Sequence, residues 1–134
     1  MKVSAQRSAN MRAIRAKNTS PELKVRKMLR AFAPGYRLHR KDIPGKPDVA
    51  YVGAKRAIFV HGCFWHGHDC KWGARVPKTN VKYWRAKIGG NRARDARHAI
   101  ELKAMGWRAL TIWECELRAP KKAEARLRRF VLRG

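Results

Sequence analysis

The stretch that most restricts how this chain can fold runs from Phe59 to Cys70 and reads Phe-Val-His-Gly-Cys-Phe-Trp-His-Gly-His-Asp-Cys. It holds three of the five histidines and two of the three cysteines, with two adjacent aromatic residues among them. A β-type run, Ala57-Ile58-Phe59-Val60, leads into it, and glycines follow. The pattern predicts a buried strand that ends in a loop with little apolar core of its own.

Soft metal ligands are concentrated in this loop. Cys63, His68 and Cys70 lie within eight residues, and Cys115 follows the end of a later predicted strand. If the two strands are neighbours, the four side chains converge on a set typical of a closed, tetrahedral structural zinc site. A Cys63–Cys70 disulfide and three free thiols are the alternatives. We favour zinc, because metal binding orders loops that lack a core.

Two histidines remain after the zinc set is assigned. His61 ends the predicted strand and His66 follows the aromatic pair. Histidine is the side chain that titrates near neutral pH without perturbation, so both are candidates for proton transfer.

Asp48 begins a predicted strand directly after Pro47. It is either a turn cap or a ligand for Mg²⁺, which prefers one or two carboxylates plus water and phosphate oxygens. A Pro-Asp pair, a hairpin and a reactive residue at the end of the next strand form the layout of PD-(D/E)xK nucleases. The second acid and the lysine of that motif are missing here, where the sequence is Phe59-Val60-His61.

The net charge is +24, from 33 Lys and Arg against 9 Asp and Glu, and it is spread over helix-like and strand-like segments. This indicates a folded domain with a polyanionic partner, nucleic acid foremost. The length of 134 residues fits a basic N-terminal arm over residues 1–18 and one domain over 19–134. We expect a cytoplasmic protein, since residues 1–18 lack the apolar run of a signal peptide and no segment approaches the ~20 apolar residues of a membrane span.

The expected elements form an α/β sandwich, one mixed central sheet with helices on both faces. The first helix begins at Thr19-Ser20-Pro21-Glu22, capped either by Ser20 or by a capping box of Thr19 and Glu22. The remaining expected elements are strands at 36–40, 48–52, 56–62 and 107–113, a helix from Asn80 interrupted at Gly89-Gly90, a second helical run over 91–105, and a last helix from Pro120. A helix before the fourth strand predicts a parallel crossover.

Four segments together carry a family resemblance: Pro47-Asp48, Phe59–Cys70, Asn91–Asp95 and Trp113-Glu114-Cys115. They resemble the very-short-patch repair (VSR) DNA mismatch endonucleases, and Asn10–Ile14 is similar to that family's N-terminal segment. The resemblance covers nearly the whole chain. It implies a restriction-endonuclease-like fold and Mg²⁺-dependent nicking of DNA, 5′ to the T of a T:G mismatch that arises from deaminated 5-methylcytosine.

The resemblance also implies catalytic roles. Asp48 would bind Mg²⁺ with help from the main-chain carbonyl of Val60. His61 and His66 would act at the scissile phosphate, with His66 preferred as the proton carrier. Asp95 would orient or support a histidine. Glu22 would lie near the metal-bound waters, although its place at a helix start is also explained by capping.

Structural zinc ligands and DNA contacts are implied as well. The zinc ligands are Cys63, His68, Cys70 and Cys115. The expected DNA contacts comprise aromatic side chains that wedge beside the mismatch and residues of the basic arm; they are Phe64, Trp65, Trp84, Met11, Arg12 and Arg15. Core packing is the alternative for the rings, above all for Trp84, which lies on a helical apolar stripe, and a solvated tail is the alternative for the arm.

The implied partner is double-stranded DNA with a T:G mismatch, met by a monomer in the bacterial cytoplasm at the nucleoid, with no membrane. Association with mismatch-repair proteins or a DNA cytosine methyltransferase stays open. Two other functions remain as alternatives: a related zinc-containing nickase or restriction-type nuclease with a different site, and a non-catalytic, zinc-stabilised DNA-binding module.

Overall fold

The computed structural model describes residues 19–70 and 79–133. The predicted arm, with Met11, Arg12 and Arg15, lies outside the described residues. The described elements, in chain order, are α2 (Ser20–Phe32), β1 (Arg37–Leu38), β2 (Val49–Tyr51), β3 (Arg56–His61), α3 (Val81–Ala104), β4 (Arg108–Trp113), the 3₁₀ helix η1 (Glu114–Arg118) and α4 (Pro120–Arg133).

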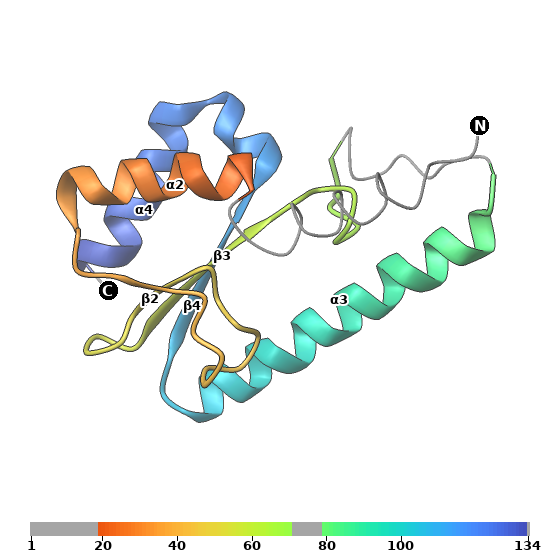
Figure 1. Ribbon diagram of the computed structural model, residues 1–134, viewed down its shortest axis with the longest axis horizontal. Coiled ribbons are helices and arrows are strands. Elements are labelled where there is room, and N and C mark those ends of the chain that lie inside the picture. The colour runs from red at the N-terminus through yellow and green to blue at the C-terminus, as the bar shows by residue number, and fades with distance from the viewer. Residues whose placement is uncertain (1–18, 71–78, 134) are drawn as a thin grey trace.

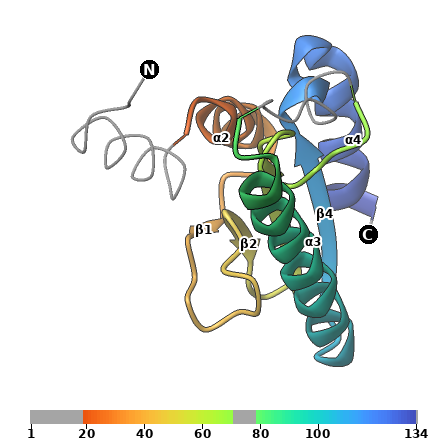
Figure 2. The same cartoon turned by 90° about the vertical axis from the view of Figure 1, so that its right-hand side faces the viewer.

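The four strands form one sheet in the order β1-β2-β3-β4. The first three strands are antiparallel neighbours, and β4 runs parallel to β3, with His61 opposite Trp113. The expected parallel crossover through a helix is therefore confirmed. Figures 1 and 2 show α2 and α4 together on one side of the sheet and α3 on the other, which confirms the expected sandwich.

Alternation along the strands divides the core between the two faces. Val49 and Ile58 point toward α2 and α4, in a cluster with Val25, Leu29 and Leu127. Ala50 and Leu102 belong to a smaller second cluster under α3, packed with Ile43, Phe59 and Trp107. Successive strand residues face opposite sides, so the same short strands serve both helical layers.

Helix α2 begins where the sequence predicted. The hydroxyl of Thr19 accepts a hydrogen bond from the backbone N–H of Glu22, at 3.3 Å, so the cap is Thr19 and not Ser20. The Glu22 side chain points inward and is 1% exposed. This carboxylate therefore needs an explanation beyond capping.

The prediction of two helical runs in the middle of the chain is wrong. The structure has one continuous helix, α3, through Gly89-Gly90. A Cβ at either glycine would meet no atom within 4 Å, so neither residue marks a close contact. Ile88 and Leu102 are buried on either side of the pair, and this packing offsets the roughly 1 kcal/mol that each interior glycine costs a helix.

Two smaller details also differ from expectation. The first strand has two residues, Arg37–Leu38, not the five expected at 36–40. Asn80 does precede α3, but it takes a left-handed conformation with φ 57° and its side chain makes no cap hydrogen bond.

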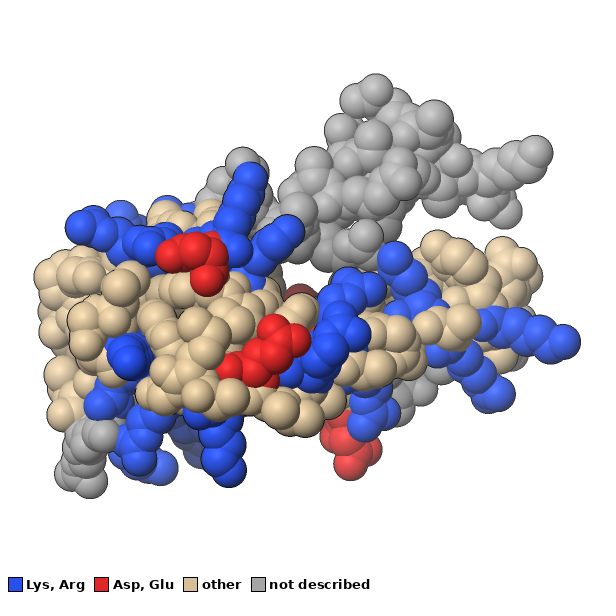
Figure 3. Space-filling view, turned by 90° about the horizontal axis from the view of Figure 1, so that it is seen from below, with Lys and Arg blue, Asp and Glu red and all other residues tan. Residues whose placement is uncertain are grey.

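Positive charge is spread widely over the face of the molecule that Figure 3 shows. In the view of Figure 3, Lys and Arg side chains are spread over the visible face and acidic side chains are few. In the described part of the chain, no helix is long and apolar enough to cross a membrane.

Candidate active site and metal centre

A cluster of acidic and imidazole groups lies where α2 meets the start of β2. One ligand atom each from Glu22, His39 and Asp48 lies within 4.8 Å of the others. The His39 ring nitrogen Nε2 is 2.9 Å from Glu22 Oε2, and Arg26 donates to the same oxygen at 3.3 Å. The buried Glu22 is thus held in place by two basic side chains while it faces Asp48.

Asp48 is anchored to β3. Its Oδ2 accepts a hydrogen bond from the backbone N–H of Val60, at 2.7 Å. The N–H and C=O of one strand residue point to the same side, so the Val60 carbonyl also faces toward β2. Burial above all, with a smaller contribution from the neighbouring Glu22 carboxylate, raises the pKa of Asp48 to about 7, although the hydrogen bond from the Val60 N–H opposes the shift. A cation bound between the Asp48 and Glu22 carboxylates would stabilise their ionised forms and so lower the pKa of Asp48 again.

The two remaining histidines of the loop form a stacked pair. The rings of His61 and His66 are 3.7 Å apart and 2° from parallel. Asp95, on α3, places Oδ2 2.6 Å from His66 Nδ1 and 4.0 Å from His61 Nδ1. With the His66 Nδ1–H donating to Asp95, the second nitrogen, Nε2, is left to accept a proton.

Burial lowers the pKa of His61 to about 4, and the adjacent His66 ring contributes to the decrease. His61 is therefore neutral at neutral pH. A neutral ring stacked on His66 adds no like charge beside it, so the Asp95 carboxylate dominates the electrostatics of the pair.

One cavity joins the acidic cluster to the histidine pair. It has a volume of about 340 Å³, and its lining includes Asp48, Val60, His61, His66 and Asp95. Groups from the segment before β2, from β3, from the loop after β3 and from the middle of α3 thus face a common space. A carboxylate suited to a hard cation and an imidazole suited to proton transfer lie on its walls.

The four predicted soft ligands converge in the structure. Ligand atoms of Cys63, His68, Cys70 and Cys115 all lie within 4.8 Å of one another. The backbone N–H of Cys115 donates to Cys63 Sγ at 3.4 Å, and Cys115 Sγ is 3.5 Å from His68 Nδ1. All three cysteines are free, so the disulfide alternative is not what the structure shows. This cluster could hold a metal ion.

Burial and ring stacking define the environment of this cluster. Burial raises the pKa of Cys63 to about 12, so its thiolate is disfavoured until a positive charge offsets the lost solvation. The His68 ring stacks on Trp113 at 4.0 Å and 10°, which fixes the orientation of the imidazole. Because Cys115 follows β4, a metal here would tie the loop after β3 to the end of β4.

The three predicted wedge residues form a ring cluster beside the histidines. Phe64, Trp65 and Trp84 have pairwise centroid distances of 5.0 to 5.5 Å. All three are partly exposed, which separates them from the two buried cores. Tyr83, 59% exposed, adds a fourth ring 5.0 Å from Trp84.

Gly67 lets the loop approach α3. Its φ is +59°, a conformation that disfavours side chains, and a Cβ there would lie 2.7 Å from Ile88 and 3.0 Å from Arg92. Asn91 Nδ2 also donates to the Trp65 carbonyl at 2.7 Å. The loop is thus seated on α3, with Asp95 one turn further along the helix to meet His66.

This geometry agrees with the comparisons to known proteins. Residues 2–72 match the family model described as DNA mismatch endonuclease Vsr. The chain is 48% identical over 121 residues to the type II nicking enzyme V.XorIIP of Xanthomonas oryzae pv. oryzae, an alignment that covers 90% of this chain and 88% of the relative. The chain belongs to the Vsr DNA mismatch endonuclease family. It is an endonuclease, and its substrate is DNA.

Further comparisons support membership of the Vsr family. The DNA mismatch endonuclease Vsr of Escherichia coli is 41% identical over 118 residues, covering 88% of this chain and 75% of the relative. Among solved structures, the catalytic domain of the homing endonuclease I-Bth0305I matches with a TM-score of 0.56 and 26% identity, over 84% of this chain and 94% of that chain. The restriction-endonuclease-like fold expected from the sequence is supported by this neighbour.

The structure brings together all nine predicted side chains of the catalytic and zinc sets, in three adjoining groups around β3. It also adds His39, which the sequence analysis did not select. The available signal was weak: a histidine near the end of the short strand expected over 36–40. Tyr83 was likewise missed, although its position beside Trp84 marked it as a further exposed ring.

Proposed function

We propose that this endonuclease nicks one strand of duplex DNA on the 5′ side of the thymine in a T:G mismatch that arises from deaminated 5-methylcytosine. The observation that carries the proposal is the single cavity shared by Asp48, the Val60 backbone and the His66–Asp95 pair. Every group of the proposed site comes from one chain, so we also propose that the enzyme acts as a monomer.

The donor set beside this cavity fits Mg²⁺. Asp48 supplies a carboxylate and Val60 a carbonyl that faces the same side, while Glu22 is close enough to hold metal-bound water. Two carboxylates with room for water and phosphate oxygens suit this ion. When bound, Mg²⁺ would supply Lewis-acid polarisation of the phosphate and stabilisation of the leaving oxygen.

The histidine pair provides the proton transfer. Water adds to phosphorus, the bond from phosphorus to the 3′ oxygen breaks, and the proton lost by water passes to His66 Nε2. Asp95 holds His66 in the required tautomer through Nδ1 and stabilises the imidazolium that forms. His61, neutral and stacked on His66, restricts the ring to one orientation and lies near enough to contact the same phosphate.

Mismatch selection is assigned to the ring cluster of Phe64, Trp65 and Trp84. Phe64 and Trp65 directly precede His66 in the loop after β3, and Trp84 of α3 packs against both rings. Insertion of these rings between base pairs would place a neighbouring phosphate at the cavity. Unstacking a normal step costs a few kcal/mol, and a mismatched pair costs less. The rings therefore distinguish a mismatched from a matched duplex by how easily the base pairs unstack as well as by direct contact.

The soft cluster is assigned to a structural Zn²⁺. Four protein ligands leave no open position for substrate or water, which is the pattern of a structural site. Its role is to hold the loop that carries Phe64, Trp65 and His66. Zinc would thus support catalysis only by fixing the position of this loop.

The test uses two duplex oligonucleotides that differ at one pair, T:G or C:G, within a cytosine-methylation context. We expect one nick 5′ to the T in the first duplex with Mg²⁺, and none in the second. Cutting of both duplexes would keep the nuclease and remove the mismatch specificity. Tight binding without any cutting would favour a DNA-binding module.

A further inference from the structure

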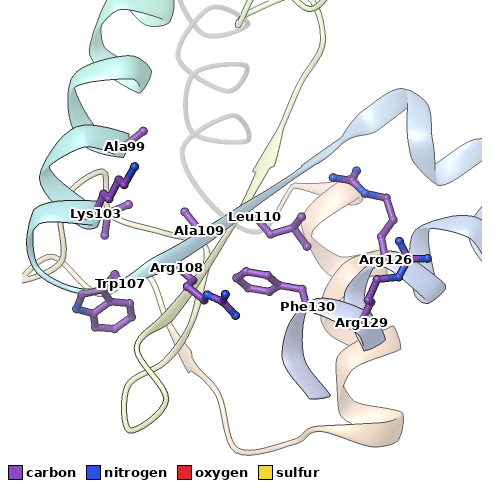
Figure 4. A pocket seen from close by; sticks show the side chains of 10 residues that line it. Ala99, Lys103, Trp107, Arg108, Ala109, Leu110, Arg126, Arg129 and Phe130 are labelled. Atoms are coloured by element: carbon purple, nitrogen blue, oxygen red, sulfur yellow. The ribbon is translucent and has the colours of Figure 1, made fainter. Parts of the chain in front are cut away.

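A second, larger cavity lies away from the proposed catalytic groups. It has a volume of about 720 Å³, and side chains from α3, β4 and α4 surround it (Figure 4). Its lining residues are Ala99, Leu102, Lys103, Trp107, Arg108, Ala109, Leu110, Arg126, Arg129 and Phe130. Four of these are cations and none is an acid.

Its position relative to the sheet is unusual. Successive strand residues point to opposite faces, yet consecutive residues from Arg108 to Leu110 all line this cavity. Helix α3 contributes from one face of the sheet and α4 from the other. The cavity is therefore a groove over the edge of β4, which is the last strand of the sheet within the described residues.

The direction of the backbone groups on this edge follows from two hydrogen bonds. The N–H of Arg108 donates to the carbonyl of Lys55 at 2.9 Å, on the side of β3. In a parallel pair the inward and outward residues alternate, so the N–H and C=O groups of Ala109 and Thr111 face away from β3. The outward N–H of Trp113 is already bonded to Glu116 Oε1 at 3.0 Å, which ends the open part of the edge.

We propose that this groove binds an extended acidic peptide segment of a partner protein, which adds a strand to the edge of β4. Main-chain hydrogen bonds to Ala109 and Thr111 would give the pairing. Acidic side chains of the segment would meet Lys103 and Arg129 on the two walls, and apolar ones would contact Trp107 and Phe130. Strand addition to an exposed sheet edge is an established mode of peptide recognition.

DNA fits this groove less well, although it fits the charge. The open edge presents carbonyl acceptors as well as N–H donors, and a phosphodiester offers acceptors only. The carbonyls of Ala109 and Thr111 would face phosphate oxygens with nothing between them to donate a hydrogen bond. A peptide backbone donates and accepts in alternation, so it satisfies both kinds of group.

The groove is also set apart from the proposed wedge. In the strand register Ala109 lies opposite Ala57, four residues before His61, or about 13 Å along β3. The groove and the catalytic cavity nevertheless share Ala99, Leu102 and Ala109 as wall residues. A peptide in the groove would therefore lie beside the catalytic cavity without covering the ring cluster.

The test measures binding of a fluorescein-labelled eight-residue peptide that alternates Asp or Glu with Val, against the same peptide N-methylated at every second residue. The two peptides carry equal charge, and only the first can pair along a strand. We expect N-methylation to weaken binding about tenfold, and hydrogen exchange to show protection of the Ala109 and Thr111 amides by the first peptide alone. Equal affinity for both peptides would show that charge alone drives binding, without strand pairing, and would overturn the proposal.

Two protein variants localise the binding. Ala109→Pro removes an outward N–H without touching the ladder to β3, and the double variant Lys103→Glu, Arg129→Glu reverses the charge of both walls. Each should weaken peptide binding about tenfold or more, whereas the charge-matched control Lys121→Glu, Lys122→Glu, on exposed residues of α4 outside the groove, should not. Unfolding midpoints establish that each variant is folded, and the charge variant decides the question if Ala109→Pro does not fold.

Two results would overturn the proposal directly. If a short DNA duplex protects the Ala109 and Thr111 amides and competes with the peptide, the groove is a nucleic-acid site. If neither ligand protects them, the cations serve only to keep the edge of β4 from pairing with other chains, which is a common protection for exposed edges.

Discussion

Two of the ligand clusters in the described part of the chain lie at different places along β3 and differ in chemistry. The cluster of Cys63, His68, Cys70 and Cys115 follows the carboxyl end of β3 and consists of soft donors that can enclose an ion completely. The cluster of Glu22, His39 and Asp48 lies on the β2 side of that strand and borders a cavity of about 340 Å³.

We propose that this difference in chemistry separates a structural role from a catalytic one. Thiolates and imidazole in a closed set favour zinc and leave no site for substrate. Carboxylates beside an open cavity favour a hard cation with exchangeable water and phosphate ligands. The His66–Asp95 pair lies between the two clusters. His66 belongs to the loop that carries three of the four soft ligands, and its ring faces the cavity that Asp48 also lines.

The largest effect is expected from removal of a soft ligand. Cys115→Ser should lose the metal and lower the free energy of unfolding by about 3 to 5 kcal/mol, less than the ~10–16 kcal/mol of a zinc-finger peptide because the rest of the domain has its own core. Nicking should also be lost, because the loop after β3 that carries His66 would lose its structure. Metal content by mass spectrometry and denaturant unfolding check this; a variant that keeps its stability and its activity would remove the structural role.

Substitutions in the His66–Asp95 pair sharpen the comparison, since they should lower the rate of nicking without changing the free energy of unfolding. His66→Ala should lower kcat for nicking about 10²- to 10⁴-fold, the usual range for loss of a general base. Asp95→Asn should give a smaller loss with an altered pH profile, because the amide still positions the ring but no longer stabilises its charge. Single-turnover kinetics measure both.

Asp42→Asn is the matched control for the Asp95 change. This carboxylate is exposed and pairs with Arg40, away from both clusters. An equal loss of rate in the Asp42 variant would show that the effect reflects general charge and not the pair with His66.

Much of this organisation could be predicted from the sequence. The strand pattern, the crossover and the soft ligands were accessible because the strong β-type run of β3 and the clustered Cys and His leave few alternatives. The restriction-endonuclease-like fold and the family followed from four segments together, of which the run Phe59–Cys70 is the most specific. These features depend on local patterns and on one strand neighbour.

Other features depend on contacts distant in sequence and were missed. Gly89-Gly90 predicts an interruption locally, but burial of Ile88 and Leu102 keeps α3 continuous. His39 has no local motif, and only the fold brings it 2.9 Å from Glu22. The groove over β4 could not be foreseen either, since its walls come from α3 and α4 on opposite faces of the sheet.

The ring cluster should affect mismatch discrimination more than turnover. Trp65→Ala or Trp84→Ala should weaken binding to the mismatched duplex by about 1–3 kcal/mol, the usual value of one base–ring stacking contact, with a smaller loss on the matched duplex. Ile100→Ala, at a 71% exposed apolar position of the same helix, is the control. Equal losses on both duplexes would assign the rings to packing or to nonspecific DNA binding.

The smallest effect is expected at His39. His39→Gln keeps a hydrogen-bond donor near Glu22 but removes the imidazole, so the metal concentration for half-maximal nicking should rise a few-fold. Manganese titration followed by electron paramagnetic resonance gives a readout that does not depend on turnover. An unchanged manganese affinity would limit His39 to a packing role against Glu22 of α2.

The separation of the two clusters is tested most directly by measuring zinc content and nicking on one preparation of Asp48→Asn. We predict one zinc per chain, an unfolding midpoint within the range of the unchanged protein, and nicking of the T:G duplex reduced by at least about 10³-fold. Loss of zinc together with activity would contradict the account, because the two clusters would then act as one site. Retention of full activity would contradict it equally, since Asp48 would not hold the catalytic ion.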